Sequence, residues 1–163
     1  MSKRINHTPI QWKPLFISLF IPLAVGGLSA WLTHDAMDAY KNLKQPPLAP
    51  PGWVFPAVWS VLYALMGIAA YLVWVRDSTG RTGALFWYGL QLACNFLWTL
   101  IFFNMGQYAL AFFWILGLWI LIFITTVRFF RETSAAGWLL LPYLLWTAFA
   151  AYLNLGVWFL GLA

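Results

Sequence analysis

Residues 108–127 read YALAFFWILGLWILIFITTV, a run of twenty residues without one charged side chain. The hydrocarbon core of a bilayer is about 30 Å thick, and roughly 20 helical residues cross it. Four more runs meet the same criterion, at residues 14–33, 53–75, 83–103 and 137–160. The sequence therefore predicts an all-α membrane protein, a bundle of five transmembrane helices that forms a single domain over residues 1–163.

The composition agrees with that prediction, since 63% of the residues are hydrophobic, only 8% are charged, and the mean hydropathy is +0.79. No Asp, Glu, Lys or Arg occurs in residues 45–75, 82–127 or 133–163. These stretches can lie in hydrocarbon without desolvating an ion. The lipid bilayer is thus an expected partner, and we expect no nucleic acid partner, because the net charge of +5 reports membrane orientation.

The basic residues are divided unequally between the two sides of the predicted bundle. Seven lie at the N-terminus and in the segments 76–81 and 128–131, whereas the other side has only Lys41 and Lys44. Cytoplasmic loops carry the excess of Lys and Arg. For a protein of an ordinary plasma membrane, we therefore expect an integral multi-pass arrangement with the N-terminus in the cytoplasm. The single cysteine, Cys94, allows no disulfide framework, and no metal site is predicted.

The connections between the predicted spans are short, at residues 76–81, 104–107 and 128–136, except for the first, at 34–52. Short connections place sequential helices as antiparallel neighbours. The long one contains QPPLAPPG at residues 45–52, where four prolines exclude a helix and favour a stiff, extended chain. We expect residues 34–52 to form an ordered lid over one end of the bundle, with a solvated linker as the alternative.

Polar and aromatic residues recur at helical spacing on three of the spans. They are Pro56, Trp59 and Tyr63 on the second span, Gln91, Asn95 and Trp98 on the third, and Tyr143, Trp146, Thr147, Ala150 and Asn154 on the fifth. The first span instead has a row of mainly small residues that permits close helix approach: Ser18, Pro22, Gly26, Ser29 and Thr33. The fourth has little polarity and is the expected lipid-facing wall.

Buried amides and phenols need hydrogen-bond partners in hydrocarbon, so these polar rows should face one another. Two interpretations remain open. The side chains could simply join the helices by hydrogen bonds. Alternatively, they could line an apolar, aromatic cavity with a few polar groups, which is the usual composition of a pocket for a flat hydrophobic ligand.

Three motifs carry a resemblance to a known family. They are PPLAPPGWVFPAVWSVLYALMG at residues 46–67, NFLW at 95–98 followed by Phe102 and Phe103, and PYLLWTAFAAYLN at 142–154. In this order and spacing the chain resembles the translocator protein family, also called TspO or peripheral-type benzodiazepine receptor. The resemblance covers nearly the whole chain from residue 14 onward, and the short C-terminus suggests a bacterial member.

The resemblance implies a five-helix bundle, often homodimeric, whose cavity beneath the first loop binds porphyrins such as protoporphyrin IX and, in many members, synthetic isoquinoline carboxamides. No cofactor is required, and the porphyrin is the ligand. The positions that match the family's ligand-binding residues are Tyr40, Trp59, Tyr63, Asn95, Trp98, Trp146 and Ala150.

The sequence also departs from the family at several places. Many members have tryptophan where this chain has Ala39 and Leu48, so the lid lacks two aromatic surfaces. The cholesterol motif of animal members, with a Tyr and then a basic residue, is absent, because Leu155 and Phe159 stand at those places. Cholesterol binding is therefore not supported.

Three functions are compatible with the sequence. The first is a membrane binding protein for porphyrins, acting in tetrapyrrole sensing, transport or regulation. The second is enzyme-like, light- and oxygen-dependent porphyrin degradation, which the resemblance would assign to Trp59 and Trp146, although no carboxylate, Lys or His lies within a span as an acid or base. The third is passive transport of hydrophobic ligands, since a mid-membrane ionisable residue for coupled transport is lacking.

Overall fold

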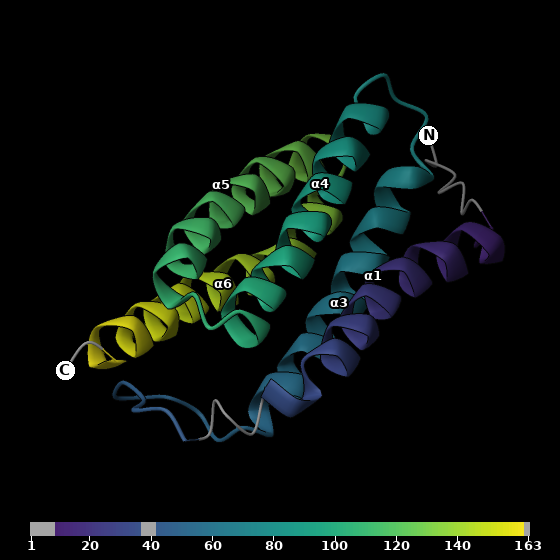
Figure 1. Ribbon diagram of the computed structural model, residues 1–163. Helices are drawn as coiled ribbons and strands as arrows, with labels where there is room; N and C mark the ends of the chain where they lie inside the picture. Colours follow the sequence, from purple (N-terminus) through teal and green to yellow (C-terminus); the bar gives the residue numbers. More distant parts are fainter. Residues whose placement is uncertain (1–8, 37–41, 162–163) are drawn as a thin grey trace, which may run out of the picture.

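Five long helices form the bundle in the computed structural model, which describes residues 9–36 and 42–161 (Figure 1). Each is long and apolar enough to cross a membrane, which confirms the predicted fold class. A π-helical turn, η1 (Leu100–Asn104), extends the third of them. The helices are α1 (Trp12–Leu32), α3 (Val54–Trp74), α4 (Arg81–Thr99), α5 (Tyr108–Glu132) and α6 (Ser134–Gly161).

The predicted spans match the helix ends to within three residues except at the last connection. The break expected at residues 128–136 is wrong, because α5 continues to Glu132 and α6 begins at Ser134. Only Thr133 between them is extended, with φ −161° and ψ 134°. Loss of apolar character marks where a span leaves the hydrocarbon, but a helix can continue into the polar headgroup region by satisfying its own backbone.

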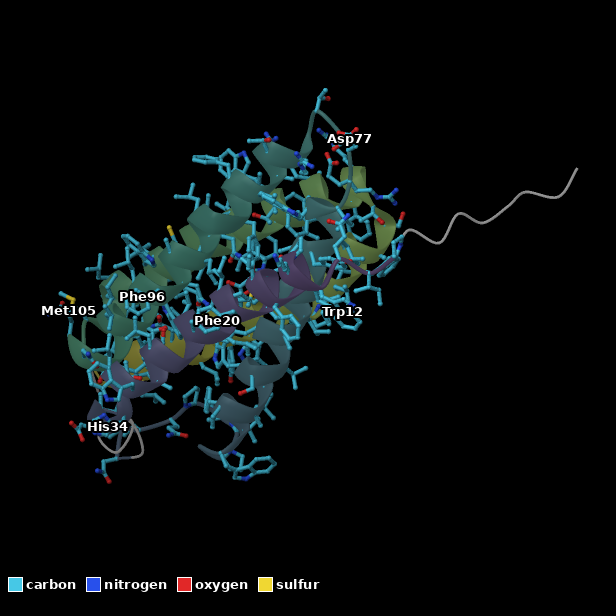
Figure 2. The ribbon with its side chains drawn as sticks, turned by 90° about the vertical axis from the view of Figure 1, so that its right-hand side faces the viewer. Trp12, Phe20, His34, Asp77, Phe96 and Met105 are labelled. Atoms are coloured by element: carbon cyan, nitrogen blue, oxygen red, sulfur yellow. The ribbon has the colours of Figure 1, made fainter. Side chains whose placement is uncertain are left out.

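Three of the four successive helix pairs are packed side by side, whereas α3 and α4 make little contact, although their short connection predicts neighbours. α1 lies along α3 and α5 lies along α6, while α4 packs on α5 and α3 packs on α6 (Figure 1). Asp77, which follows α3, lies at one end of the bundle, and His34 and Met105 lie toward the other (Figure 2). α1 is the most exposed helix, since only 11% of the residues in its apolar 18-residue stretch are buried.

The contact between α1 and α3 depends on a missing side chain. A Cβ atom at Gly67 would lie 2.7 Å from the carbonyl oxygen of Ser18 and 2.8 Å from the Cα of Leu19. Both neighbours are backbone atoms, which cannot rotate away. The close approach predicted from the small residues of the first span is therefore present, and Ser29 lies buried on the same helix.

Two tryptophans join α5 to its neighbours through their indole N–H groups. Trp114 donates to the carbonyl oxygen of Cys94 on α4 at 2.9 Å, and Trp119 donates to that of Leu144 on α6 at 3.1 Å. The opposite face of α5 exposes large apolar side chains such as Phe113 and Ile120. The helix is thus an outer wall of the bundle, as its sequence predicts.

Replacing Gly67 with alanine is predicted to lower the free energy of unfolding by about 1–3 kcal/mol, because the added methyl group forces α1 away from α3. The matched control is Gly89→Ala on α4, where an added Cβ meets nothing within 4 Å. This control should be neutral or stabilising by up to about 1 kcal/mol, since alanine has the higher helix propensity. Unfolding in a detergent–denaturant titration followed by circular dichroism measures both, and equal effects would contradict the assignment.

Candidate functional site

A cavity of about 370 Å³ lies inside the bundle, toward the end where α1 finishes and α3 begins. Its volume falls within the range of small-molecule sites, near the lower end. Four of the five helices contribute to its wall, and α5 contributes none of the described lining residues. The lining residues are Gly26, Ser29, Ala30, Thr33, His34, Phe55, Pro56, Trp59, Tyr63, Trp98, Thr99, Phe102, Phe103, Trp146, Ala150, Leu153 and Asn154.

The residues predicted as ligand contacts are distributed unequally around this cavity. Trp59, Tyr63, Trp98, Trp146 and Ala150 line it. Asn95 does not, and its side chain is buried where it can reach Tyr63. Tyr40 lies outside the described residues, as does Ala39. The geometry therefore brings five of the seven together, while their roles in binding stay predictions.

Aromatic rings cover much of the cavity wall. The ring centroids of Trp59 and Tyr63 are 5.5 Å apart, and those of Phe55 and Trp146 are 6.1 Å apart with the rings nearly perpendicular. Trp98 stacks on Phe102 at 5.4 Å. Such surfaces favour flat, apolar ligands, because ring faces offer large contact areas and specific stacking geometries.

The π-helical turn positions two of these rings. In η1 the N–H of Met105 donates to the carbonyl oxygen of Leu100, five residues earlier, at 3.0 Å. This wider turn lets the neighbouring residues Phe102 and Phe103 both line the cavity. Single π-turns inside helices often occur at functional sites. The sequence does not predict this turn, because no local pattern marks it, although both phenylalanines belong to the motif that carries the resemblance.

The polar face of α4 is paired with its neighbours through three side-chain hydrogen bonds. Asn95 Nδ2 donates to the Tyr63 hydroxyl of α3 at 3.0 Å, and the Tyr143 hydroxyl of α6 donates to Gln91 Oε1 at 2.8 Å. Trp98 Nε1 donates to Oδ1 of Asn154, also on α6, at 3.3 Å. Gln91 and Asn95 therefore join helices below the cavity, which supports the first of the two interpretations for these amides.

Two polar atoms on the cavity wall have no such partner. The hydroxyl of Ser29 and the indole N–H of Trp146 are both buried, and neither has a hydrogen-bond partner in the part of the chain that the structure describes. A buried donor without a partner costs free energy. The second interpretation, a cavity with a few polar groups, therefore also finds support at positions other than the amides.

The described part of the first loop, residues 42–52, lies against the end of α6. Pro46 is buried next to Gly156, where any Cβ would collide with the proline ring. Tyr152 donates from its hydroxyl to the carbonyl oxygen of Pro47 at 2.8 Å. The described proline segment is therefore anchored on α6. Its role as a lid stays a prediction, because none of its described residues lines the cavity.

Leu48 in the proline segment points away from the cavity. It occupies the third position of a tight turn, in which the N–H of Ala49 donates to the carbonyl oxygen of Pro46 at 3.2 Å. Its φ of 69° is strained for a leucine, and its side chain is 82% exposed and lines no part of the cavity. Leu48, which stands where the resemblance implies a tryptophan in many members, thus adds no surface to the cavity in this conformation.

His34, which follows the end of α1, is a polar residue of the cavity lining. It lines the mouth, yet its side chain is 67% exposed. One ring nitrogen, Nδ1, lies 2.8 Å from the Trp31 carbonyl oxygen, and the other, Nε2, lies 2.9 Å from Asp35 Oδ1. Both ring nitrogens therefore have partners within the chain, next to the end of α1.

Comparison with known proteins gives a consistent result. Residues 18–159 match the sequence profile of the TspO/MBR family. The tryptophan-rich sensory protein of Cereibacter sphaeroides is 42% identical over 71% of this chain and 72% of its own length. Protein CrtK of Rhodobacter capsulatus is 35% identical over 88% of this chain and 91% of its own. The human translocator protein is 38% identical over 80% of this chain and 79% of its own.

The bond between Asn95 and Tyr63 predicts an energetic coupling between α4 and α3. A double-mutant cycle of Asn95→Leu and Tyr63→Phe should give a coupling free energy of about 0.6–1.7 kcal/mol, the range for hydrogen bonds between membrane helices. In the control cycle, Tyr63→Phe is combined with Trp114→Phe, which removes the separate bond to Cys94. That cycle should be additive within about 0.5 kcal/mol. Equal coupling in the two cycles would refute the pairing.

Proposed function

The chain belongs to the TspO/MBR family, and from this membership and the cavity we propose that it binds porphyrins such as protoporphyrin IX, and similar planar hydrophobic molecules. The aromatic wall would hold the flat ring system by stacking and by burial of apolar area. Binding of this kind requires no cofactor and no metal ligand from the protein.

The observation that carries the proposal is the unpaired indole N–H of Trp146 in a mostly apolar wall. A ligand with a hydrogen-bond acceptor, such as a ring nitrogen or a carboxylate, would relieve the cost of leaving that donor unpaired. The Ser29 hydroxyl, unpaired on the α1 side of the same cavity, offers a second such contact. One apolar surface with two directional contacts would fix the orientation of a flat molecule.

The biological role of binding is proposed from the names of the relatives. One relative is named a sensory protein and another a translocator protein, and we propose a role in tetrapyrrole sensing, transport or regulation. Light- and oxygen-dependent degradation at Trp59 and Trp146 stays an alternative, because both rings line the cavity. Passive transport of hydrophobic ligands is the other alternative. Product formed with more than one turnover per protein would favour degradation.

A homodimer is also proposed, from the resemblance alone. The exposed apolar side chains of α1, among them Phe16, Phe20 and Trp31, would face either lipid or a second copy of the chain.

Trp146→Phe is predicted to raise the Kd for protoporphyrin IX about tenfold, the effect of losing one hydrogen bond of about 1.4 kcal/mol. The matched control is Trp138→Phe on the same helix, a ring that is 65% exposed and lines no part of the cavity. The control should change the Kd less than about twofold. The measurement is a titration that follows the Soret absorbance of the porphyrin in lipid nanodiscs, so that loss of tryptophan fluorescence does not interfere. Absence of saturable binding to the unsubstituted protein would refute the proposal.

The proposed orientation places the N-terminus in the cytoplasm of a bacterial cell. In a Cys94→Ser background, Lys44→Cys should react with a membrane-impermeant maleimide on intact cells. Asp77→Cys should react only after the cells are permeabilised. Both positions are exposed and lie at opposite ends of the bundle. The reverse labelling pattern would show that the positive-inside assignment is wrong.

A further inference from the structure

A second hollow, the α3–α6 groove, lies where α3 and α6 meet on the outer side of the bundle. It measures about 570 Å³, and every one of its lining residues is apolar. Several point outward, since Val61 is 59% exposed and Leu145 is 71% exposed. The lining residues are Ala57, Val58, Val61, Leu62, Leu65, Pro142, Leu145, Trp146 and Phe149.

Trp146 is the one described residue that lines both the groove and the internal cavity. The Trp146 ring packs against Phe55, a cavity residue, with a centroid distance of 6.1 Å. It also packs against Phe149, a groove residue, with a centroid distance of 5.6 Å. Its N–H has no partner among the described residues, so no hydrogen bond fixes the indole in place. The two spaces therefore adjoin at the Trp146 side chain.

The groove and the cavity lie at the same depth in the bundle. On α3, groove residues such as Ala57 and Val58 alternate along the chain with cavity residues such as Pro56 and Trp59. On α6, Pro142 at the groove has no backbone N–H, so the helix lacks the hydrogen bond to the carbonyl oxygen of Trp138, in the part of α6 that precedes Trp146. A helix that lacks this bond bends more readily than a regular one.

The surroundings of the groove are set by the membrane. α3 and α6 are long and apolar enough to cross the bilayer, so the groove opens toward lipid chains and not toward water. A planar hydrophobic molecule is already concentrated in that phase. When it enters the groove it displaces only acyl chains and desolvates no polar group of the protein. At the other end of the cavity, the anchored proline segment at Pro46 and Pro47 lies against α6.

We propose that the α3–α6 groove is a second binding site for the same planar hydrophobic ligand, facing the membrane, and that the ligand passes from it into the cavity when the Trp146 ring turns aside. This inference rests on the proposed function. The groove is then the entrance from the bilayer, and the loop does not have to open for each binding event.

The test measures rates of porphyrin association in nanodiscs by stopped flow. Filling the groove with Val61→Trp and Leu145→Trp should lower both the association and the dissociation rate constants at least about tenfold. The Kd should change less than about threefold, because the cavity itself is intact. Both side chains face lipid, so larger apolar rings are compatible with the fold, and Val61→Trp alone is the second variant if the pair unfolds. The matched control is Ile120→Trp with Phe113→Trp on the exposed face of α5, which should leave the rates unchanged.

A loop tether separates the two possible entrances. In a Cys94→Ser background, a short bis-maleimide crosslink between Pro47→Cys and Tyr152→Cys joins two exposed positions that are in contact, and it should leave the association rate unchanged. Normal association after groove filling, together with slow association in the tethered protein, would overturn the inference and leave the proposed function standing. No saturable Soret change in the unsubstituted protein at equilibrium would instead overturn the proposed function itself.

Discussion

The structure depends on one constraint, which is that hydrocarbon offers no hydrogen bonds to a buried polar side chain. α4 carries three such side chains along one face, Gln91, Asn95 and Trp98, and each is paired with a partner on α3 or α6. These bonds fix how the three helices face one another. α1 and α5 are held differently, by the close approach at Gly67 and by the indole bonds of α5.

The same constraint explains why the cavity wall is mainly aromatic and apolar. Because the amides of α4 are used between helices, the cavity wall consists mainly of aromatic rings and small residues, and Asn154 is the one amide among its described lining residues. Two polar atoms, on Ser29 and Trp146, remain without partners there. The charge-free spans leave no acid or base in the wall within the membrane, while His34 at the mouth is engaged with Trp31 and Asp35. The arrangement therefore suits binding of a flat apolar molecule better than acid–base chemistry.

Much of the fold could be predicted from sequence, because the exclusion of charge from lipid is a property of residue type alone. The five spans, the inward rows of Trp59 and Trp146, and the outer position of the fourth span all follow from it. What could not be predicted depends on three-dimensional contacts. The π-turn at Leu100 depends on packing, and Asn95 lies below the cavity because Tyr63 lies within reach of its amide. The α3–α6 groove likewise exists only once two distant segments are packed together.

The central claim is that the cavity within the bundle is where the ligand binds, and the most direct measurement compares two identical changes on α6. Ala150 lines the cavity, whereas Ala148 is exposed on the same helix. Isothermal titration calorimetry of protoporphyrin IX with the Ala150→Leu and Ala148→Leu proteins in nanodiscs gives the two affinities. Their comparison distinguishes a cavity site from a surface site. The account predicts binding weakened at least about tenfold by Ala150→Leu and unchanged by Ala148→Leu in two folded proteins. Equal affinities would contradict it.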